Sequence, residues 1–336
     1  YILHYTQPGD IVFDGFCGTG MTGVAAQMCG DRNEVMALGY QVKPDGTILR
    51  NETDENGRKV WKPFSKLGAR KSVLNDLAPA ATFIAHNHNR KVSSREFEIL
   101  AKKTLKNLVS KCGWAYETLH SDGKTKGKIN YTVWSDVFIC PECAGHLSAW
   151  KLYYNERPGA VNQKMVCWHC NSELKRNDLD RVLVTELDPV TKTPVNSIKQ
   201  IPVFINYSIG KKRFEKRPDE LDIERLESSL KSISNINYPV SPIMFKGENW
   251  GDTWRAGIHK GTERVDQFYF GRTLYVLSEF LKLSNEKYGS QFQFLLGSVL
   301  PKLTRMNRYM PQHGSRALVG PMANTMYLPP LCVENN

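Results

Sequence analysis

A short apolar run near the start of the chain ends in an acid and passes directly into a glycine-rich stretch. Residues 11–13 are apolar, Asp14 follows them, and glycines recur through residues 15–20 before the small side chains of residues 24–26. Glycines let the backbone approach a ligand closely, and the start of the following helix offers unpaired N–H groups. The pattern therefore predicts a strand, a tight turn and a helix that together form a ligand loop.

The same alternation of strand and helix returns further along the chain. Residues 71–77 predict a short strand that ends in an acid, and Pro79 stands in the first turn of the next predicted helix. In doubly wound sheets an acid at the end of the second strand accepts hydrogen bonds from a ribose. Asp76 is our candidate for that role, and capping of the helix by Asp76 is the alternative.

A β insertion is predicted between these two strands. Residues 40–49 alternate around a Pro-Asp-Gly turn, and a second turn follows at residues 54–57. This pattern predicts a β-hairpin insertion at about residues 31–67, in the first crossover of the fold. The insertion accounts for the long interval between Asp14 and Asp76.

An amphipathic helix is predicted beyond the second unit. Ser93 and Glu96 have the spacing of a capping box, which opens a helix that ends near Cys112. We expect its apolar side to lie in the core; that side consists of Phe97, Leu100, Leu105, Leu108 and Val109.

Composition and charge narrow the class of protein. The chain has 336 residues, of which 41% are hydrophobic and 24% charged, as is usual for globular proteins. It lacks an apolar run of 18 residues, so we expect no membrane span. The net charge of +11 favours a polyanionic partner, with an inert basic surface as the alternative.

Since Tyr1 is the first residue and no signal-like segment precedes the first strand, we expect a cytoplasmic protein and a chain that begins inside a longer one.

Four of the eight cysteines form two Cys-x-x-Cys pairs, Cys140 with Cys143 and Cys167 with Cys170. Two such pairs supply four thiolates, which fill a tetrahedral zinc ion and leave no position for substrate. We therefore predict a zinc ribbon with a structural role, for which His146 and His169 are unnecessary. Free thiols and an iron–sulfur site are the alternatives.

The first strand and its loop also carry a family resemblance. Pro8, Gly9 and Asp10 before the strand, and the run from Asp14 to Gly20 after it, resemble the start of bacterial amino-methylating DNA methyltransferases, of the N6-adenine and N4-cytosine type. The resemblance implies an α/β, Rossmann-like fold that binds S-adenosylmethionine, a cationic cofactor for which an acid at the strand end is suited. The cofactor-binding residues that it implies are Tyr5, Thr6, Asp14, Phe16, Cys17, Gly18, Thr19, Gly20, Thr22 and Asp76.

The catalytic motif of that family is missing from the sequence. Its Asp/Asn/Ser-Pro-Pro-aromatic motif holds the exocyclic amine of a flipped base, and the only Pro-Pro here, Pro329 and Pro330, lies between Leu328 and Leu331. We therefore assign no catalytic residue. Two interpretations follow: the motif lies beyond Asn336, or the chain binds the cofactor and is inert. In both cases we expect this chain alone to be inactive.

Large bacterial adenine-type DNA methylases, which the chain is similar to, place recognition elements between the cofactor and catalytic motifs. By that resemblance, residues from about 113 to 320 hold target-recognition or DNA-holding elements. The basic run at 211–217 and the basic and polar stretches at 302–309 and 313–316 are candidate DNA contacts, with solvated surface as the alternative. Residues 250–260 are rich in glycine and aromatic side chains and predict a shaped loop.

These observations combine into one hypothesis. We expect a cofactor-binding part at residues 1–112, a zinc ribbon insertion at 113–200, and a mixed α/β region with DNA-contacting loops at 201–336. The expected activity is methyl transfer from S-adenosylmethionine to DNA, at adenine N6, within a restriction-modification or defence system that includes a partner subunit. The alternatives are an RNA methyltransferase and a non-catalytic zinc-ribbon module with a vestigial cofactor fold.

Overall fold

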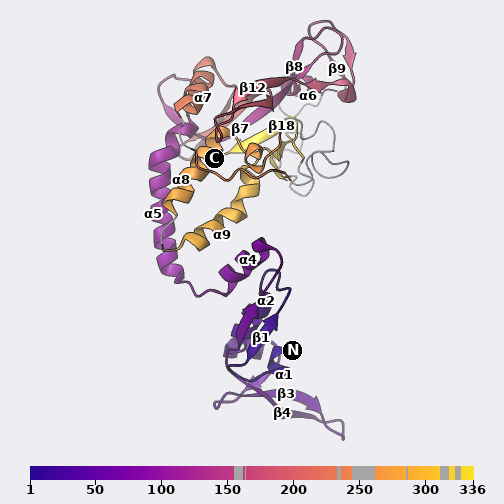
Figure 1. The fold of residues 1–336 in the computed structure, drawn as a ribbon, viewed down its shortest axis with the longest axis vertical. Coiled ribbons are helices and arrows are strands. Elements are labelled where there is room, and N and C mark those ends of the chain that lie inside the picture. The colour runs from indigo at the N-terminus through magenta and orange to yellow at the C-terminus, as the bar shows by residue number, and fades with distance from the viewer. Residues whose placement is uncertain are drawn as a thin grey trace. The chain divides into compact units, whose positions relative to one another are not determined.

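A computed structural model describes most of the chain, and it divides these residues into two compact units, Tyr1–Glu98 and Ile99–Asn336 (Figure 1). Among the described residues, none of the helices has the length and apolar character needed to cross a bilayer. The candidate stretches at 250–260 and 313–316 lie outside the described residues. Those residues are 1–154, 162, 164–232, 236–243, 262–284, 287–310, 318–321 and 327–336.

Unit 1 contains the predicted strand, turn and helix. β1 (Ile11–Asp14) pairs in parallel with β5 (Lys71–Leu74), and the register places Asp14 opposite Leu74. Each strand leads into a helix, β1 into α2 (Met21–Met28) and β5 into α4 (Pro79–Asn89). α1 (Ile2–Tyr5) precedes the sheet. The unit is thus a mixed α/β structure around one parallel strand pair.

The insertion between the strands differs in part from the predicted hairpin. It begins with a helix, α3 (Arg32–Ala37), because Asp31 caps it by accepting hydrogen bonds from the N–H groups of Asn33 and Glu34. An antiparallel sheet of three strands then follows, in the order β2-β3-β4. The strands are β2 (Gln41–Val42), β3 (Thr47–Thr53) and β4 (Lys59–Lys66). A separate apolar cluster that includes Leu3, Val35 and Ile48 joins the insertion to α1.

Unit 2 is built around one long strand, β7 (Lys126–Ile139), whose middle is buried. Its sheet has the order β15-β14-β7-β18-β16-β17, with three further strands beside β7, and every pairing in the described part is antiparallel. The other strands of this sheet are β6 (Glu117–Leu119), β8 (His146–Ser148), β11 (Asp180–Arg181), β14 (Gln200–Ile209), β15 (Lys212–Lys216), β16 (Asn307–Tyr309), β17 (Leu318–Pro321) and β18 (Leu331–Asn335).

Smaller elements complete unit 2. Two short hairpins stand apart from the sheet, β9 with β10 and β12 with β13. Their bounds are β9 (Met165–Val166), β10 (Glu173–Leu174), β12 (Leu183–Leu187) and β13 (Pro194–Ile198). The helices are α5 (Ser94–Cys112), whose first turn belongs to unit 1, α6 (Ala149–Tyr154), α7 (Glu220–Ser232), α8 (Gly271–Leu283) and α9 (Gly289–Val299). The 3-10 turns are η1 (Gly113–Tyr116), η2 (Arg176–Asp178), η3 (Val265–Phe268) and η4 (Leu300–Leu303).

The predicted core side of α5 is partly wrong. The helix starts as expected, since the N–H of Glu96 donates to the Ser93 hydroxyl, but Leu105 and Val109 are 59% and 51% exposed. The buried residues of α5 are Thr104 and Cys112. They lie on one line along the helix, with residues spaced by four. This buried line is narrower than the apolar face that the sequence predicts for the helix. The helix therefore packs along one ridge and leaves two predicted core residues in solvent.

A buried ion pair and its hydrogen bonds join four elements of unit 2, α8, β18, β7 and η1. The Arg272 guanidinium at the start of α8 binds Glu334 of β18, with 2.5 Å between Nη2 and Oε2, and the two side chains are 6% and 0% exposed. Glu334 also accepts hydrogen bonds from the indole of Trp134 and the hydroxyl of Tyr116. Because both charges have partners, the pair can lie in the interior.

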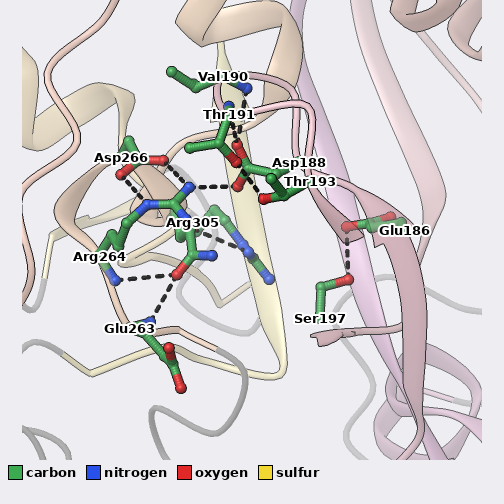
Figure 2. Close-up of polar contacts among 11 residues, drawn as sticks. Glu186, Asp188, Val190, Thr191, Thr193, Ser197, Glu263, Arg264, Asp266 and Arg305 are labelled. Carbon is green, nitrogen blue, oxygen red and sulfur yellow. Dashed lines mark hydrogen bonds and ion pairs between the residues drawn. The ribbon is translucent and has the colours of Figure 1, made fainter. Parts of the chain in front are cut away.

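A second ionic cluster holds the β12–β13 hairpin against η3 (Figure 2). Arg264 binds Asp266 through two bonds of 3.0 and 2.8 Å, and its Nη2 lies 2.5 Å from Asp188 in the hairpin turn. Asp188 accepts two further hydrogen bonds from the N–H groups of Val190 and Thr191. Both carboxylates are almost fully buried, so this arginine fixes the hairpin turn.

Replacing one partner of the central pair should destabilise unit 2 strongly. We expect Arg272→Met to lower the free energy of unfolding by about 3–5 kcal/mol, because it leaves the Glu334 charge buried and unpaired. Urea unfolding followed by tryptophan fluorescence measures this. The double variant Arg272→Met/Glu334→Leu should be more stable than the single one, and Lys126→Met, which removes an exposed partner of Glu117, should cost less than about 1 kcal/mol. Equal losses for Arg272→Met and Lys126→Met would contradict the assignment.

Candidate cofactor loop and thiolate cluster

Two carboxylates lie at the same edge of the unit 1 sheet. Because β1 and β5 are parallel and in register, Asp14 and the Asp76 that follows β5 both stand at the carboxyl ends of their strands. Backbone hydrogen bonds tie the two chain segments together beyond the strands. The Asn75 N–H donates to the Asp14 carbonyl and the Cys17 N–H to the Asn75 carbonyl, both at 2.9 Å. The loop that follows β1 is therefore held against the end of β5.

Glycine is required at the start of α2 by geometry. Gly20 has a φ of +80°, and a Cβ added there would lie 2.6 Å from the Cβ of Ala85 in α4. Gly18 also has a positive φ, of +51°, but no atom lies within 4 Å of where its Cβ would be. Gly20 therefore permits α2 to pack closely against α4, whereas the space beside Gly18 is open to a ligand.

Asp14 orders the loop from within. Its Oδ1 accepts the N–H of Phe16 at 3.2 Å, and its Oδ2 accepts the hydroxyl of Thr22 at 2.5 Å. Two of the predicted cofactor residues thus contact a third. Phe16 itself is 81% exposed, which leaves an aromatic ring beside the loop.

Asp76 holds the loop from the second strand. Its Oδ2 accepts the Gly18 N–H at 2.9 Å and its Oδ1 accepts the Ala78 N–H at 3.0 Å. These donors, first Ala78 and then Gly18, hold the pKa of the Asp76 carboxyl below its ordinary value. A carboxylate has about four lone-pair sites, so Asp76 retains capacity to accept hydrogen bonds from a ribose.

Other residues of the loop are positioned by α4, which sequence reasoning missed. The His88 ring contacts the Thr19 carbonyl at 2.9 Å, and the Asn89 amide donates to the Gly20 carbonyl at 3.0 Å. Both follow Ala85 at the spacing of one helix face, which is the signal that the sequence offers. Burial, followed by the charges of Asp76 and Asp14, raises the pKa of the Cys17 thiol, so Cys17 is a neutral part of the loop.

Tyr5 and Thr6 precede β1 and are not part of the loop between β1 and α2. Thr6 lies at the amino end of the sheet, where its hydroxyl accepts a hydrogen bond from the buried Arg70 at 3.0 Å. Tyr5 is 76% exposed. The structure thus brings together the predicted residues from Asp14 to Thr22 with Asp76, and it leaves Thr6 at the opposite end of β1.

The four paired cysteines of unit 2 converge. Their sulfur atoms all lie within 4.8 Å of one another, and Cys140 and Cys167 are buried while Cys143 and Cys170 are exposed. The two pairs have the same backbone geometry. In each, the residue after the second cysteine donates its N–H to the first cysteine's carbonyl, Ala144 to Cys140 at 2.9 Å and Asn171 to Cys167 at 2.8 Å.

This repeated geometry fits a tetrahedral metal ion with four sulfur ligands. The side chain of His169 is directed to the carbonyl of His146, at 3.2 Å, which leaves the thiols as the converging donors. The His169 N–H also donates to the sulfur of Cys167, as is usual for a turn around a thiolate.

The Pro-Pro sequence has a structural role. The Pro330 carbonyl accepts the N–H of Asp136, and the Leu328 carbonyl accepts a hydrogen bond from Arg181. Leu328 and Leu331 are buried. The segment is therefore the buried entrance to β18.

Comparison with known proteins bears on the first part of the chain. The model of the N6/N4 DNA methylase family matches residues 1–45. The match includes β1, the glycine loop and α2, and it ends before Asp76 and the cysteine pairs. No curated protein and no solved structure matches the chain. The finding supports a relation of this segment to the amino-methylating DNA methyltransferases.

The role of Gly20 can be tested against a matched glycine. We expect Gly20→Ala to destabilise unit 1 by more than about 1 kcal/mol, because the positive φ and the contact with Ala85 both oppose a Cβ. Gly57→Ala is the control, since Gly57 has a φ of +75° but no atom within 4 Å of its Cβ position. Hydrogen exchange of the α2 amides, measured by mass spectrometry, should rise for Gly20→Ala and stay unchanged for Gly57→Ala. Equal exchange in both variants would contradict a packing role.

Proposed function

We propose that this protein is an S-adenosylmethionine-dependent DNA methyltransferase that acts on an exocyclic amine, adenine N6. The observation that carries the proposal is the loop between β1 and α2, which matches the DNA methylase family and lies beside Asp14 and Asp76. The parallel strands around it are consistent with a Rossmann-like cofactor fold. A role in restriction-modification or defence, with a partner subunit, is part of the same proposal.

The residues of the loop fit the chemistry of this cofactor. S-adenosylmethionine, when bound, supplies a methyl group on a positively charged sulfur. Asp14 and Asp76 provide negative charge at one edge of the sheet, and the spare lone pairs of Asp76 suit a ribose hydroxyl. The open space beside Gly18 allows close approach of the ligand, and the exposed Phe16 ring offers an apolar surface beside it.

We propose that the Cys140, Cys143, Cys167 and Cys170 cluster binds zinc in a structural role. Four sulfur ligands complete a tetrahedral shell, so no position is left for water or substrate. The site joins two turns that are 23 residues apart in the sequence, and it would thereby hold one end of unit 2 in place. In this proposal residues 1–112 bind the cofactor and residues 113–200 form the zinc ribbon.

Calorimetry with S-adenosylmethionine tests the function directly. We expect the chain to bind the cofactor, and Asp14→Ala to weaken binding by about tenfold or more, because a carboxylate that orders the loop is removed. Asp10→Ala is the matched control, since Asp10 bonds to the Gln7 N–H at the amino end of β1. Absence of binding by the unchanged chain would favour a zinc-ribbon module with a vestigial cofactor fold.

Metal analysis tests the thiolate cluster. We expect about one zinc ion per chain, retained through gel filtration and lost in Cys143→Ser, because three thiolates hold zinc less tightly than four. Cys29→Ser, which changes a buried thiol in unit 1, should keep the metal. Iron together with acid-labile sulfide in the purified protein would instead indicate an iron–sulfur centre.

A further inference from the structure

One end of the unit 2 sheet carries a concentration of positive charge. Two turns meet there, at residues 120–125 between β6 and β7 and at 210–211 between β14 and β15. They lie at the same end because Lys128 of β7 pairs with Glu117 on one side and with Ser208 on the other. We call this surface the basic sheet end; its cations are Lys124, Lys126, Lys128, Lys211, Lys212 and Arg213.

Strand register fixes two of these cations on one face. Lys128, Ser208 and Arg213 are direct cross-strand partners on β7, β14 and β15, so their side chains leave the same side of the sheet. Neighbouring strands are about 4.8 Å apart, which places the backbones of Lys128 and Arg213 about 10 Å from each other. The opposite face is core, where Ile129 and Tyr207 are buried.

Ser208 lies between the two cations on β14, and two asparagines lie beside it on the same face. The Asn130 amide donates to the Asn206 carbonyl oxygen and to the Ser208 hydroxyl, both at 2.8 Å. The Asn206 amide in turn donates to Glu215 at 3.1 Å. Amide and hydroxyl groups beside Lys and Arg are the side chains that commonly contact phosphate oxygens of nucleic acids. The face is thus polar, and it also carries two carboxylates, Glu117 opposite Lys128 and Glu215 two residues after Arg213.

Most of the cations here have no acidic partner. Lys126 pairs with Glu117 at 2.8 Å, and nearby Lys216 is bound by Asp219 and Asp222 at the start of α7. Within the ranges that the structure describes, the others form no ion pair with a carboxylate; they are Lys124, Lys128, Lys211, Lys212 and Arg213. All five are exposed, so their charge is available to an external anion.

We propose that the basic sheet end binds the phosphate backbone of duplex DNA. Two cations held about 10 Å apart on one sheet, with a hydroxyl between them and amides beside it, suit a repeating polyanion better than one small anion. Contacts of this kind position the protein on DNA and do not read its sequence. The choice of DNA as the polyanion rests on the proposed function.

The test measures DNA affinity of the full chain by fluorescence anisotropy with a labelled duplex of mixed sequence. We expect Lys128→Ala/Arg213→Ala to weaken binding by about tenfold or more, and to reduce the slope of log K against log salt concentration by about 2. The loss should be the same for duplexes of unrelated sequence. Arg58→Ala/Lys59→Ala is the matched control, because it removes the same two charges from an exposed turn of unit 1 and should leave affinity and slope unchanged.

Three outcomes would overturn the inference. They are an unchanged affinity in the sheet variant, an equal loss in both variants, and a loss seen with duplex RNA but not with duplex DNA. Calorimetry with S-adenosylmethionine on the same variants separates this inference from the proposed function. Cofactor binding that persists while DNA binding is unaffected by the sheet variant would overturn the DNA surface alone.

Discussion

The parallel pairing of β1 with β5 is the constraint on which the candidate cofactor site depends. A parallel pair requires the chain to cross over and return in the same direction, so that both strands end at one edge. In unit 1 that crossover contains α2, α3 and a three-stranded sheet, yet the register still places Asp14 opposite Leu74. Asp76 can therefore reach the Gly18 N–H across 58 residues of sequence. The insertion changes the length of the crossover and leaves the site geometry intact.

The sequence predicted features whose signal is local, and it missed those that depend on distant contacts. The loop after β1 and the two Cys-x-x-Cys pairs have their signal within a few residues, and the structure contains both. By contrast, Leu105 and Val109 have the periodicity of a core face, and only the line through Thr104 and Cys112 is buried. Hydrophobic periodicity shows which side of a helix can be buried; the width that is covered depends on what packs there.

Glu334 illustrates the same limit in the opposite sense. Glu334 is the second-to-last residue of β18, where a charged side chain would be expected to face solvent, yet it is completely buried. Its partners, Trp134 and Arg272, lie 200 and 62 residues away in the sequence. Because a buried carboxylate is tolerated only with such partners, its position in the core is a property of the assembled sheet rather than of β18.

The glycine loop and the cysteine turns both direct backbone N–H groups toward an acceptor, but they use different residues to do so. Both turn backbone N–H groups toward a charged or polarisable atom, Gly18 toward the Asp76 carboxylate and His169 toward the Cys167 sulfur. The loop uses glycine at positive φ, where no strain arises. The cysteine turns instead place Ala144 and Asn171 at φ of +57° and +63°, and for alanine this conformation costs about 1–2 kcal/mol. Such strain persists where surrounding bonds over-determine the backbone. Four sulfur–metal bonds would supply that constraint, so the alanine after Cys143 is itself an argument for the proposed metal.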